Sequence, residues 1–232
     1  YVYNILQYIT VSSTGNATDF GDLSAGRYNL GGSSGATRGL FAGGTNLAGS
    51  YLNIIEYITI ATTGNTTDFG DLTVARAFVS GTASAFRAVF AGGYGGSAYL
   101  NTIDYVTIAI TGNATDFGDL TAITGNTDSG CSNGVRAVFG GGSGSPHSNV
   151  IEYITIATTG NATDFGDLLT TLDSMAALSD GTKGVWGGGN ASGAGNTGSN
   201  VIQYVTIATT GNATDFGDLT VARRYFAGLS GT

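Results

Sequence analysis

The stretch TTGNATDFGDL at residues 158–168 recurs, almost letter for letter, four more times along this chain of 232 residues. Its Gly-Asn step falls at Gly15, Gly64, Gly112, Gly160 and Gly211, so the successive intervals are 49, 48, 48 and 51 residues. Self-similarity at a fixed period of this size is the signature of a repeat architecture. The chain is therefore predicted to consist of five units of about 48 residues.

Each unit contains four short segments with the composition of β-strands. In one unit they are ARAFVSGT (75–82), RAVFAGG (87–93), NTIDYVTIAI (101–110) and TDFGDL (115–120). Tyr, Phe, Ile, Val and Thr fit a pleated sheet, and both alternating sets of residues in the tyrosine segment are largely apolar or β-branched. Such a strand is expected to be buried on both faces. Four short strands per repeat of this length indicate the blade of an all-β propeller.

The composition excludes several classes of protein. Glycine occupies 40 positions and proline one, so the glycines separate ordered segments rather than marking a disordered chain. Eight Lys or Arg stand against sixteen Asp or Glu, and no basic run could follow a phosphate backbone, so nucleic acid is not an expected partner. No run of about eighteen apolar residues exists, so membrane insertion is not expected. A single cysteine, Cys131, excludes an intramolecular disulfide.

The repeat resembles that of kelch β-propellers. A double glycine closes the apolar second strand, as at Gly92 and Gly93, a tyrosine follows in the next strand, as at Tyr105, and an aromatic residue follows in the strand after that. Kelch blades usually carry Trp at this last position, where the present chain has Phe, as at Phe117, so the chain is similar to the family rather than a standard member. The resemblance implies a propeller fold.

The near-identity of the units also resembles repeat-rich virion proteins of marine and cyanobacterial bacteriophages. Those proteins are mostly described as structural or tail-fibre-like. The resemblance covers the whole chain, transfers no catalytic residue, and implies a virion or extracellular location. Other virion or fibre proteins, a host surface glycan, or further copies of the chain in a homo-oligomer are the partners it implies.

Closure of the ring follows from the count of strands. The tyrosine and TDFGDL segments occur five times but the double-glycine strand only four times, so we expect a single domain, 1–232, forming a five-bladed ring with one composite blade. In it, a strand beginning near Arg223 joins the N-terminal strands around Tyr8 and Phe20. The alternative is that the chain belongs to a longer array with more blades. The expected units are 1–26, 27–75, 76–123, 124–171 and 172–222, with 223–232 closing onto 1–26.

The TDFGDL copies hold ten of the sixteen acidic residues, as pairs three positions apart. Paired carboxylates could ligate calcium, but the spacing departs from that of an EF-hand loop. They could also act as acid and base on a glycoside, but that chemistry needs one cleft with two different pKa values, not five equivalent copies. The residues favour a tight hairpin corner, with Phe between the blades and Asp outside. No catalytic residue, metal site or cofactor is predicted.

The units differ most between the double-glycine strand and the tyrosine strand, where they read TNLAGSYLN, YGGSAYLN, SGSPHSN and NASGAGNTGSN. Loops alternate between the two faces of a propeller, so these connections share a face with the LTVAR-type connection to the next blade. Variable loops on a rigid scaffold commonly carry binding specificity. The candidate ligand-binding residues are Tyr51, Tyr94, Tyr99, His147 and Asn190, whose aromatic and polar groups suit a sugar; the alternative is that these loops bind nothing.

Three functional hypotheses follow. The first is a non-enzymatic structural or adhesive propeller of a phage particle or fibre, which binds a surface glycan or another structural protein. The second is a purely structural repeat, which forms a fibre or array by strand completion between chains. The third, a carbohydrate-active enzyme, has the least support, because one histidine and one cysteine cannot supply the copper or acid–base groups that such propellers use.

Overall fold

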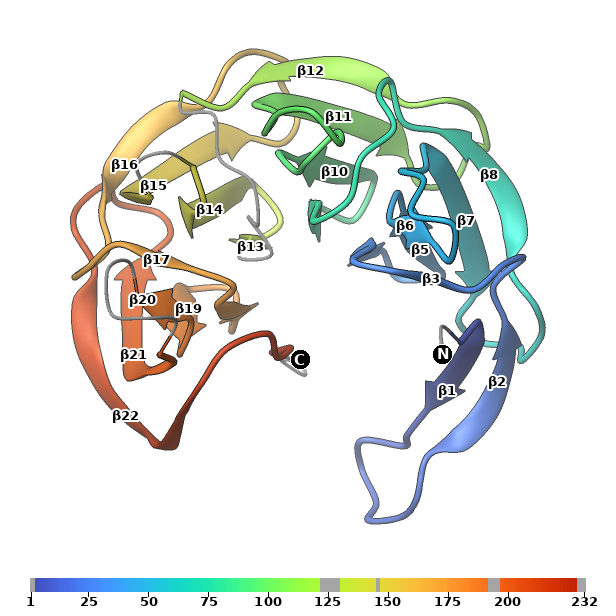
Figure 1. The fold of residues 1–232 in the computed structure, drawn as a ribbon, viewed down its shortest axis with the longest axis horizontal. Coiled ribbons are helices and arrows are strands. Elements are labelled where there is room, and N and C mark those ends of the chain that lie inside the picture. The colour runs from blue at the N-terminus through green and yellow to red at the C-terminus, as the bar shows by residue number, and fades with distance from the viewer. Residues whose placement is uncertain (1–2, 122–129, 145–146, 192–196, 229–232) are drawn as a thin grey trace.

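The computed structural model describes residues 3–121, 130–144, 147–191 and 197–228. Figure 1 shows small sheets standing side by side around a central axis, with the TDFGD strands on the outer rim. All regular elements of the described residues are β-strands, and none of these residues belongs to a helix that could cross a membrane. The predicted all-β propeller class is confirmed.

Four blades are complete, and each is an antiparallel sheet of four strands. From the axis outward, the first blade consists of β4 (Gly31–Ser34), β5 (Arg38–Ala42), β7 (Ile54–Thr59) and β8 (Thr67–Asp71). The second consists of β9 (Ser80–Ala83), β10 (Arg87–Ala91), β11 (Thr102–Thr107) and β12 (Thr115–Asp119). The third consists of β13 (Gly130–Ser132), β14 (Arg136–Gly142), β15 (Ser148–Thr155) and β16 (Thr163–Asp167). The fourth consists of β18 (Ala176–Ser179), β19 (Lys183–Gly187), β21 (Ser199–Thr206) and β22 (Thr214–Arg223).

Three two-stranded ladders complete the described structure. They are β1 (Ile5–Tyr8) with β2 (Thr18–Asp22), β3 (Arg27–Tyr28) with β6 (Thr45–Asn46), and β17 (Leu172–Asp173) with β20 (Asn190–Ala191). The β1–β2 hairpin has the sequence and pairing of the outer half of a blade, and we call it the N-terminal half-blade.

The prediction of five blades is wrong for the described residues, which form four complete blades and this half-blade. Among the described residues, strand β1 pairs only with β2, and they do not form the predicted composite blade. Figure 1 shows the ring open between the half-blade and the C-terminal end. The C-terminal residues instead follow the fourth blade, since the N–H of Tyr225 donates to the carbonyl of Ser174 at 3.2 Å. Residues 229–232 of the predicted closing segment lie outside the described residues, and the unit boundaries stay predictions.

The hydrophobic core lies in the junctions between blades. In the three junctions between complete blades, a Leu or Val of one second strand lies in the same buried cluster as a Phe or Trp of the next. Burial of each such side chain stabilises the fold by about 1.5–3 kcal/mol. The pairs are Leu40 with Phe90, Val89 with Phe139, and Val138 with Trp186. Because each core is shared by two blades, neither blade buries its apolar face alone.

The TGN turns also lie across the junctions, a feature that the sequence did not indicate. The N–H groups of Gly112 and Ala114 donate to the carbonyls of Phe69 and Asp71 in the preceding unit, both at 2.7 Å. The N–H of Asp71 donates in return to Oδ1 of Asn113 at 3.1 Å. The other three junctions repeat these three hydrogen bonds at 2.7–3.0 Å. We call this contact of a TGN turn with the preceding TDFGD strand the clasp.

In the four clasps the glycine of the TDFGD strand is required by the close approach of the turn. A Cβ atom on Gly70 would lie 2.4 Å from the carbonyl oxygen of Gly112, closer than real Cβ contacts allow. The predicted burial of Phe is confirmed at four copies, where the Phe side chain is 2–8% exposed. The predicted exposure of Asp holds for the first Asp of each of these copies, whereas the second Asp is half-buried. It is wrong at Phe216, which is 58% exposed because no blade follows it in the described chain.

Candidate functional site

The variable connections share one face of the ring with the connectors that lead to the next blade, as predicted from the alternation of loops. Strand β3 of a connector pairs with β6 of a variable connection, and β17 pairs with β20 in the same way. In the second blade Ala77 forms an isolated bridge with Tyr94. We call this surface the variable face.

Three of the predicted site residues form one aromatic cluster on the variable face, where the first and second blades meet. The ring centroids of Tyr51 and Tyr94 are 5.6 Å apart, and those of Tyr94 and Tyr99 are 5.1 Å apart. All three side chains are half-buried. Gly96 permits this packing, because a Cβ atom there would lie 2.9 Å from the Tyr51 ring, and its carbonyl accepts the Tyr94 hydroxyl at 2.9 Å.

The other two predicted residues meet at the junction of the third and fourth blades, through a buried carboxylate. Nδ1 of His147 lies 2.9 Å from Oδ2 of Asp173, and Nδ2 of Asn190 donates to the same oxygen at 3.3 Å. The Ser174 hydroxyl donates to the other carboxylate oxygen at 2.7 Å, and Arg224 donates to Oδ1 of Asn190 at 3.1 Å. The Asn190 amide is therefore engaged within the protein, whereas the His147 side chain keeps 30% of its surface exposed.

The sequence prediction missed Asp173, Ser174 and Arg224. The signal was present in the connectors, where the fourth unit reads LTTLDSM while the second reads LTVARAF. The same comparison of repeats that selected the variable connections would have selected this segment. The structure thus places the five predicted residues in two separate groups rather than in one site.

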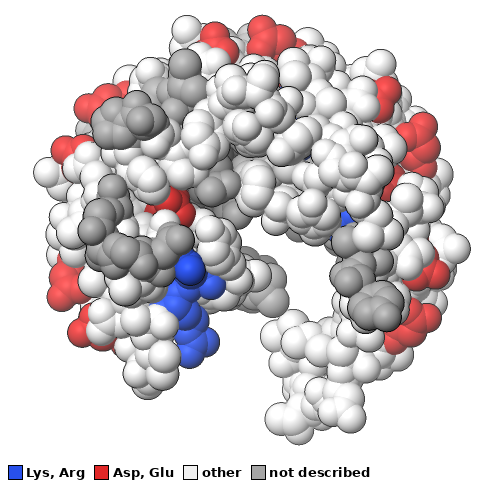
Figure 2. Space-filling view, in the orientation of Figure 1, with Lys and Arg blue, Asp and Glu red and all other residues white. Residues whose placement is uncertain are grey.

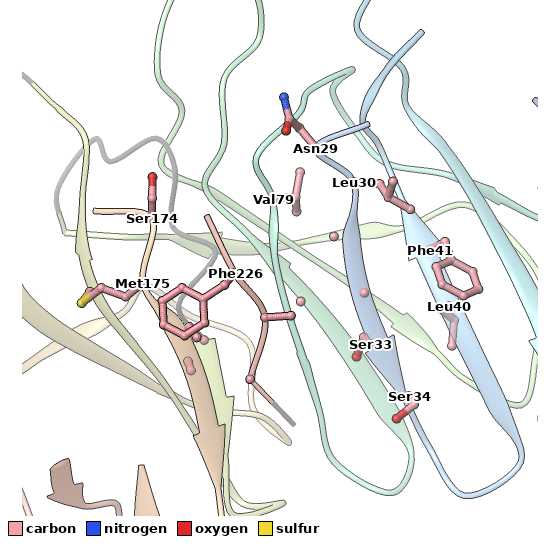
Figure 3. A pocket seen from close by; sticks show the side chains of 18 of the residues that line it. Asn29, Leu30, Ser33, Ser34, Leu40, Phe41, Val79, Ser174, Met175 and Phe226 are labelled. Atoms are coloured by element: carbon pink, nitrogen blue, oxygen red, sulfur yellow. The ribbon is translucent and has the colours of Figure 1, made fainter. Parts of the chain in front are cut away.

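A cavity of about 700 Å³ opens on the axis of the ring beside the variable face (Figure 3). Its rim includes Asn29, Ser174 and Tyr225, which hold the same position in three connectors and have positive φ values of 54–56°. Such a backbone conformation is uncommon for residues other than glycine and is frequent at functional sites. Deeper inside, the cavity is lined by small residues of the inner strands, such as Gly31 and Ala176.

Buried ion pairs hold two connectors beneath the variable face. Arg76 lies 2.9 Å from Asp104, and both side chains are completely buried; Arg27 lies 2.7 Å from Glu56. Burial lowers the pKa of both guanidinium groups below the ordinary value, and the neighbouring carboxylates oppose that shift. Each pair joins a connector to the tyrosine strand of the next blade, so its role is to anchor the loop scaffold.

Chemically reactive groups are sparse in the described part of the chain. No three His, Cys, Asp or Glu side chains of the described residues gather where they could hold a metal ion. Cys131 is buried, and burial raises the pKa of its thiol to about 12. A thiol with such a pKa is a poor nucleophile at neutral pH, because the thiolate is the reactive form.

Charge is distributed unevenly over the molecule. Figure 2 shows acidic side chains around the outer rim, while basic side chains gather beside the opening of the ring, where β22 ends. Arg223 and Arg224 lie at that end of β22.

Comparison of the chain with protein-family models and with curated protein sequences found no match.

Proposed function

We propose that this β-propeller is a non-enzymatic binding module whose ligand site is the cluster of Tyr51, Tyr94 and Tyr99 on the variable face. The observation that carries the proposal is the packing of three half-exposed tyrosines from two blades, at 5.1–5.6 Å between ring centroids, on loops that differ between the units. Tyrosine gives an apolar ring face and a polar edge at small entropic cost, which suits recognition.

The ligand class we propose is a surface glycan, with another structural protein as the second candidate. The apolar C–H faces of a sugar stack on aromatic rings, while the hydroxyl groups of Tyr51 and Tyr99 can hydrogen-bond its edges. The setting we propose is a phage virion or fibre outside the cell, on the resemblance of the near-identical repeats to phage structural proteins. On the double-glycine and tyrosine positions we propose a kelch-like propeller.

The test is glycan-array binding by the labelled chain, followed by titration of the best glycan. Tyr94→Ala and Tyr99→Ala should each weaken binding by about 1–2 kcal/mol, since aromatic anchors dominate binding energy. Tyr99→Phe keeps the ring and should retain most of the affinity. Tyr3→Ala removes an exposed tyrosine from the N-terminal half-blade and serves as the matched control. Equal binding by all four variants would remove the tyrosine cluster as the ligand site.

A further inference from the structure

We propose that each TGN hairpin carries a groove that binds a neutral sugar, so that the propeller presents the same site several times around its rim. The site differs in position and chemistry from the tyrosine cluster on the variable face, and it does not depend on a ligand there. The TGN hairpin joins the third and fourth strands of a blade, whereas the variable connection joins the second and third. Because successive connections of an antiparallel sheet lie at alternate ends, the grooves lie on the face opposite the variable face.

The hairpins of the first two blades contain equivalent grooves, of about 300 and 220 Å³. The side chains that line both are a tyrosine, three threonines and the asparagine of the clasp. They are Tyr57, Thr59, Thr63, Asn65 and Thr67 in the first blade and Tyr105, Thr107, Thr111, Asn113 and Thr115 in the second. Sites for drug-sized molecules begin at about 300 Å³, so these grooves suit a single sugar ring.

The same five residue types recur at these positions in all five units. The remaining sets are Tyr8, Thr10, Thr14, Asn16 and Thr18; Tyr153, Thr155, Thr159, Asn161 and Thr163; and Tyr204, Thr206, Thr210, Asn212 and Thr214. A further position in the same groove is not kept, since Thr62 of the first blade corresponds to Ile110 in the second and to Ser13 in the N-terminal unit. The identity of the units is therefore closest at the groups with the most hydrogen-bonding capacity.

The clasp does not account for these side chains. It uses main-chain groups of the turn and Oδ1 of the asparagine, as at Asn65, whose Oδ1 accepts the N–H of Asp22 at 3.0 Å. No hydrogen bond among the described residues engages the hydroxyl groups that line the two grooves, or Nδ2 of Asn65. A single exposed threonine is ordinary in a strand. Three in one groove, beside a free phenol and a free amide, form a set of donors and acceptors that a ligand can use.

The tyrosine of each groove is held in a fixed position. The guanidinium of Arg38 lies 4.3 Å from the centre of the Tyr57 ring, and the ring packs edge-to-face on Phe69 at 5.8 Å. The second blade repeats these contacts at 4.6 and 5.8 Å. Thr67 lies opposite Tyr57 in the β-ladder and Thr59 lies two positions along the strand, so the three side chains share one face of the blade. Groups fixed in this way lose little entropy when they bind.

The chemistry of the grooves selects an uncharged, hydroxyl-rich ligand. In the part of the chain that the structure describes, no charged side chain lines either groove. Hydroxyl and amide groups donate and accept hydrogen bonds, as the hydroxyl groups of a sugar do. Figure 2 shows acidic side chains around the outer rim, and among them Asp68 is exposed beside the first groove. These carboxylates repel an acidic sugar, so the ligand is a neutral one.

Repetition compensates for the weakness of a single groove. A few hydrogen bonds at an open site correspond to a Kd of about 1 mM. Several equal grooves on one rigid ring, however, can hold several sugars of one surface at the same time. Such multivalent contact raises the apparent affinity by about 10²–10⁴-fold. The propeller would thus adhere to a surface that repeats a neutral sugar and release the free sugar readily.

The test is a titration of the intact, ¹⁵N-labelled chain followed by NMR, with glucose, galactose, mannose, fucose and N-acetylglucosamine as neutral probes. At least one of them should shift the amide signals of Gly64 and Gly112, which line the two grooves, with similar affinity. Glucuronate and sialic acid should shift neither signal. Thr59→Val keeps the shape of the side chain and removes a hydroxyl group, so it should weaken binding at the first groove by about threefold to tenfold.

The second groove is the internal control, because its unchanged affinity shows that the variant is folded. Tyr57→Phe keeps the ring contacts and should weaken the first groove to a similar degree. Thr37→Val alters an exposed threonine outside the groove and should bind like the unaltered chain. The proposal would be overturned if no neutral sugar shifted either signal, or if Thr59→Val and Tyr57→Phe both left the first groove unchanged. Shifts confined to the amides of Tyr94 and Tyr99 would overturn it as well, while supporting the tyrosine cluster.

Discussion

Phe165 and Phe216 hold the same position in two copies of one motif, yet the first is 2% exposed and the second 58% exposed. Both keep the edge-to-face packing on the tyrosine of their own blade, at 5.9 and 5.8 Å between ring centroids. The difference arises outside the blade, because a TGN turn covers Phe165 and no turn of the described residues covers Phe216. The local motif builds the blade, while the neighbouring blade supplies the burial.

The largest expected difference in the free energy of unfolding is between the alanine variants of Phe165 and Phe216. Phe165→Ala should lower the free energy of unfolding by about 3–5 kcal/mol, because it leaves a cavity in a closed junction. Phe216→Ala removes a mostly solvated ring and should lower the free energy of unfolding by about 1 kcal/mol or less. The measurement is urea unfolding followed by tyrosine and tryptophan fluorescence. Equal losses would show that the blade itself, and not the junction, stabilises the phenylalanine.

The clasp glycines should show the next largest difference. Gly166→Ala and Gly217→Ala introduce a side chain at similar φ values, 146° and 135°, so the backbone strain is similar. Only Gly166→Ala also pushes a Cβ atom against the backbone of the following turn, which should add about 1–3 kcal/mol of destabilisation. The difference between the two urea midpoints measures that contact. No difference would mean that the junction relaxes to admit a methyl group.

The clasp asparagines should show a smaller difference. Oδ1 of Asn212 accepts the N–H of Asp167 at 3.0 Å, whereas Asn16 lies on the exposed N-terminal turn. Asn212→Ala should lower the free energy of unfolding by about 1 kcal/mol, the usual contribution of a hydrogen bond. Asn16→Ala should leave the free energy of unfolding unchanged, because no hydrogen bond among the described residues joins that turn to a preceding strand. Loss of stability in Asn16→Ala would contradict the view that this turn lacks a partner among the described residues.

The alkylation rate of Cys131 measures how often the junction of the third and fourth blades opens, because its thiol is buried in the core of that junction. With its pKa at about 12, roughly one thiol in ten thousand is ionised at pH 8, so alkylation of the folded chain should be slow. The rate should rise about tenfold per pH unit below that pKa. It should also rise in Phe165→Ala, which loosens the same core, and not in Phe216→Ala. Fast alkylation of the unaltered chain at pH 8 would show that the junction opens.

The raised pKa of the Cys131 thiol determines how the free energy of unfolding changes at alkaline pH. The thiol pKa is higher in the folded chain than its ordinary value of 9.0. The unfolded chain therefore loses the proton first as the pH rises, and the stability that comes from the neutral buried thiol is complete below about pH 9 and is lost between about pH 9 and pH 12. Cys131→Ala should remove this part of the alkaline loss of stability.

Much of the fold could be predicted from the sequence because it depends on local pattern. The repeat period, the four strands of a blade, and the placement of the variable connections beside the connectors all follow from composition and alternation. The ring closure could not be predicted, because the count of strands does not say whether a half-blade and a C-terminal segment come together. In the part of the chain that the structure describes, strand β1 of the half-blade pairs on one side only, with β2.

The candidate site residues also fall into a part that the sequence could predict and a part that it could not. The variation among units selected Tyr51, Tyr94 and Tyr99, and the structure brings them into contact, although whether they bind a ligand stays a prediction. His147 and Asn190 were selected by the same variation, but their meeting through Asp173 could not be predicted. Their contact depends on how a connector of one blade crosses the loop of another.

The sequence by itself determined the unit: its length, its strands, its turn chemistry and the apolar faces that each blade must bury. Only the tertiary structure decided how units join, because the clasp is made between residues 42–46 positions apart in the chain. The TGN turn looks like a hairpin corner when it is seen within one unit. Its amides and its asparagine find their partners in the unit before it, and no local pattern specifies a partner at that distance.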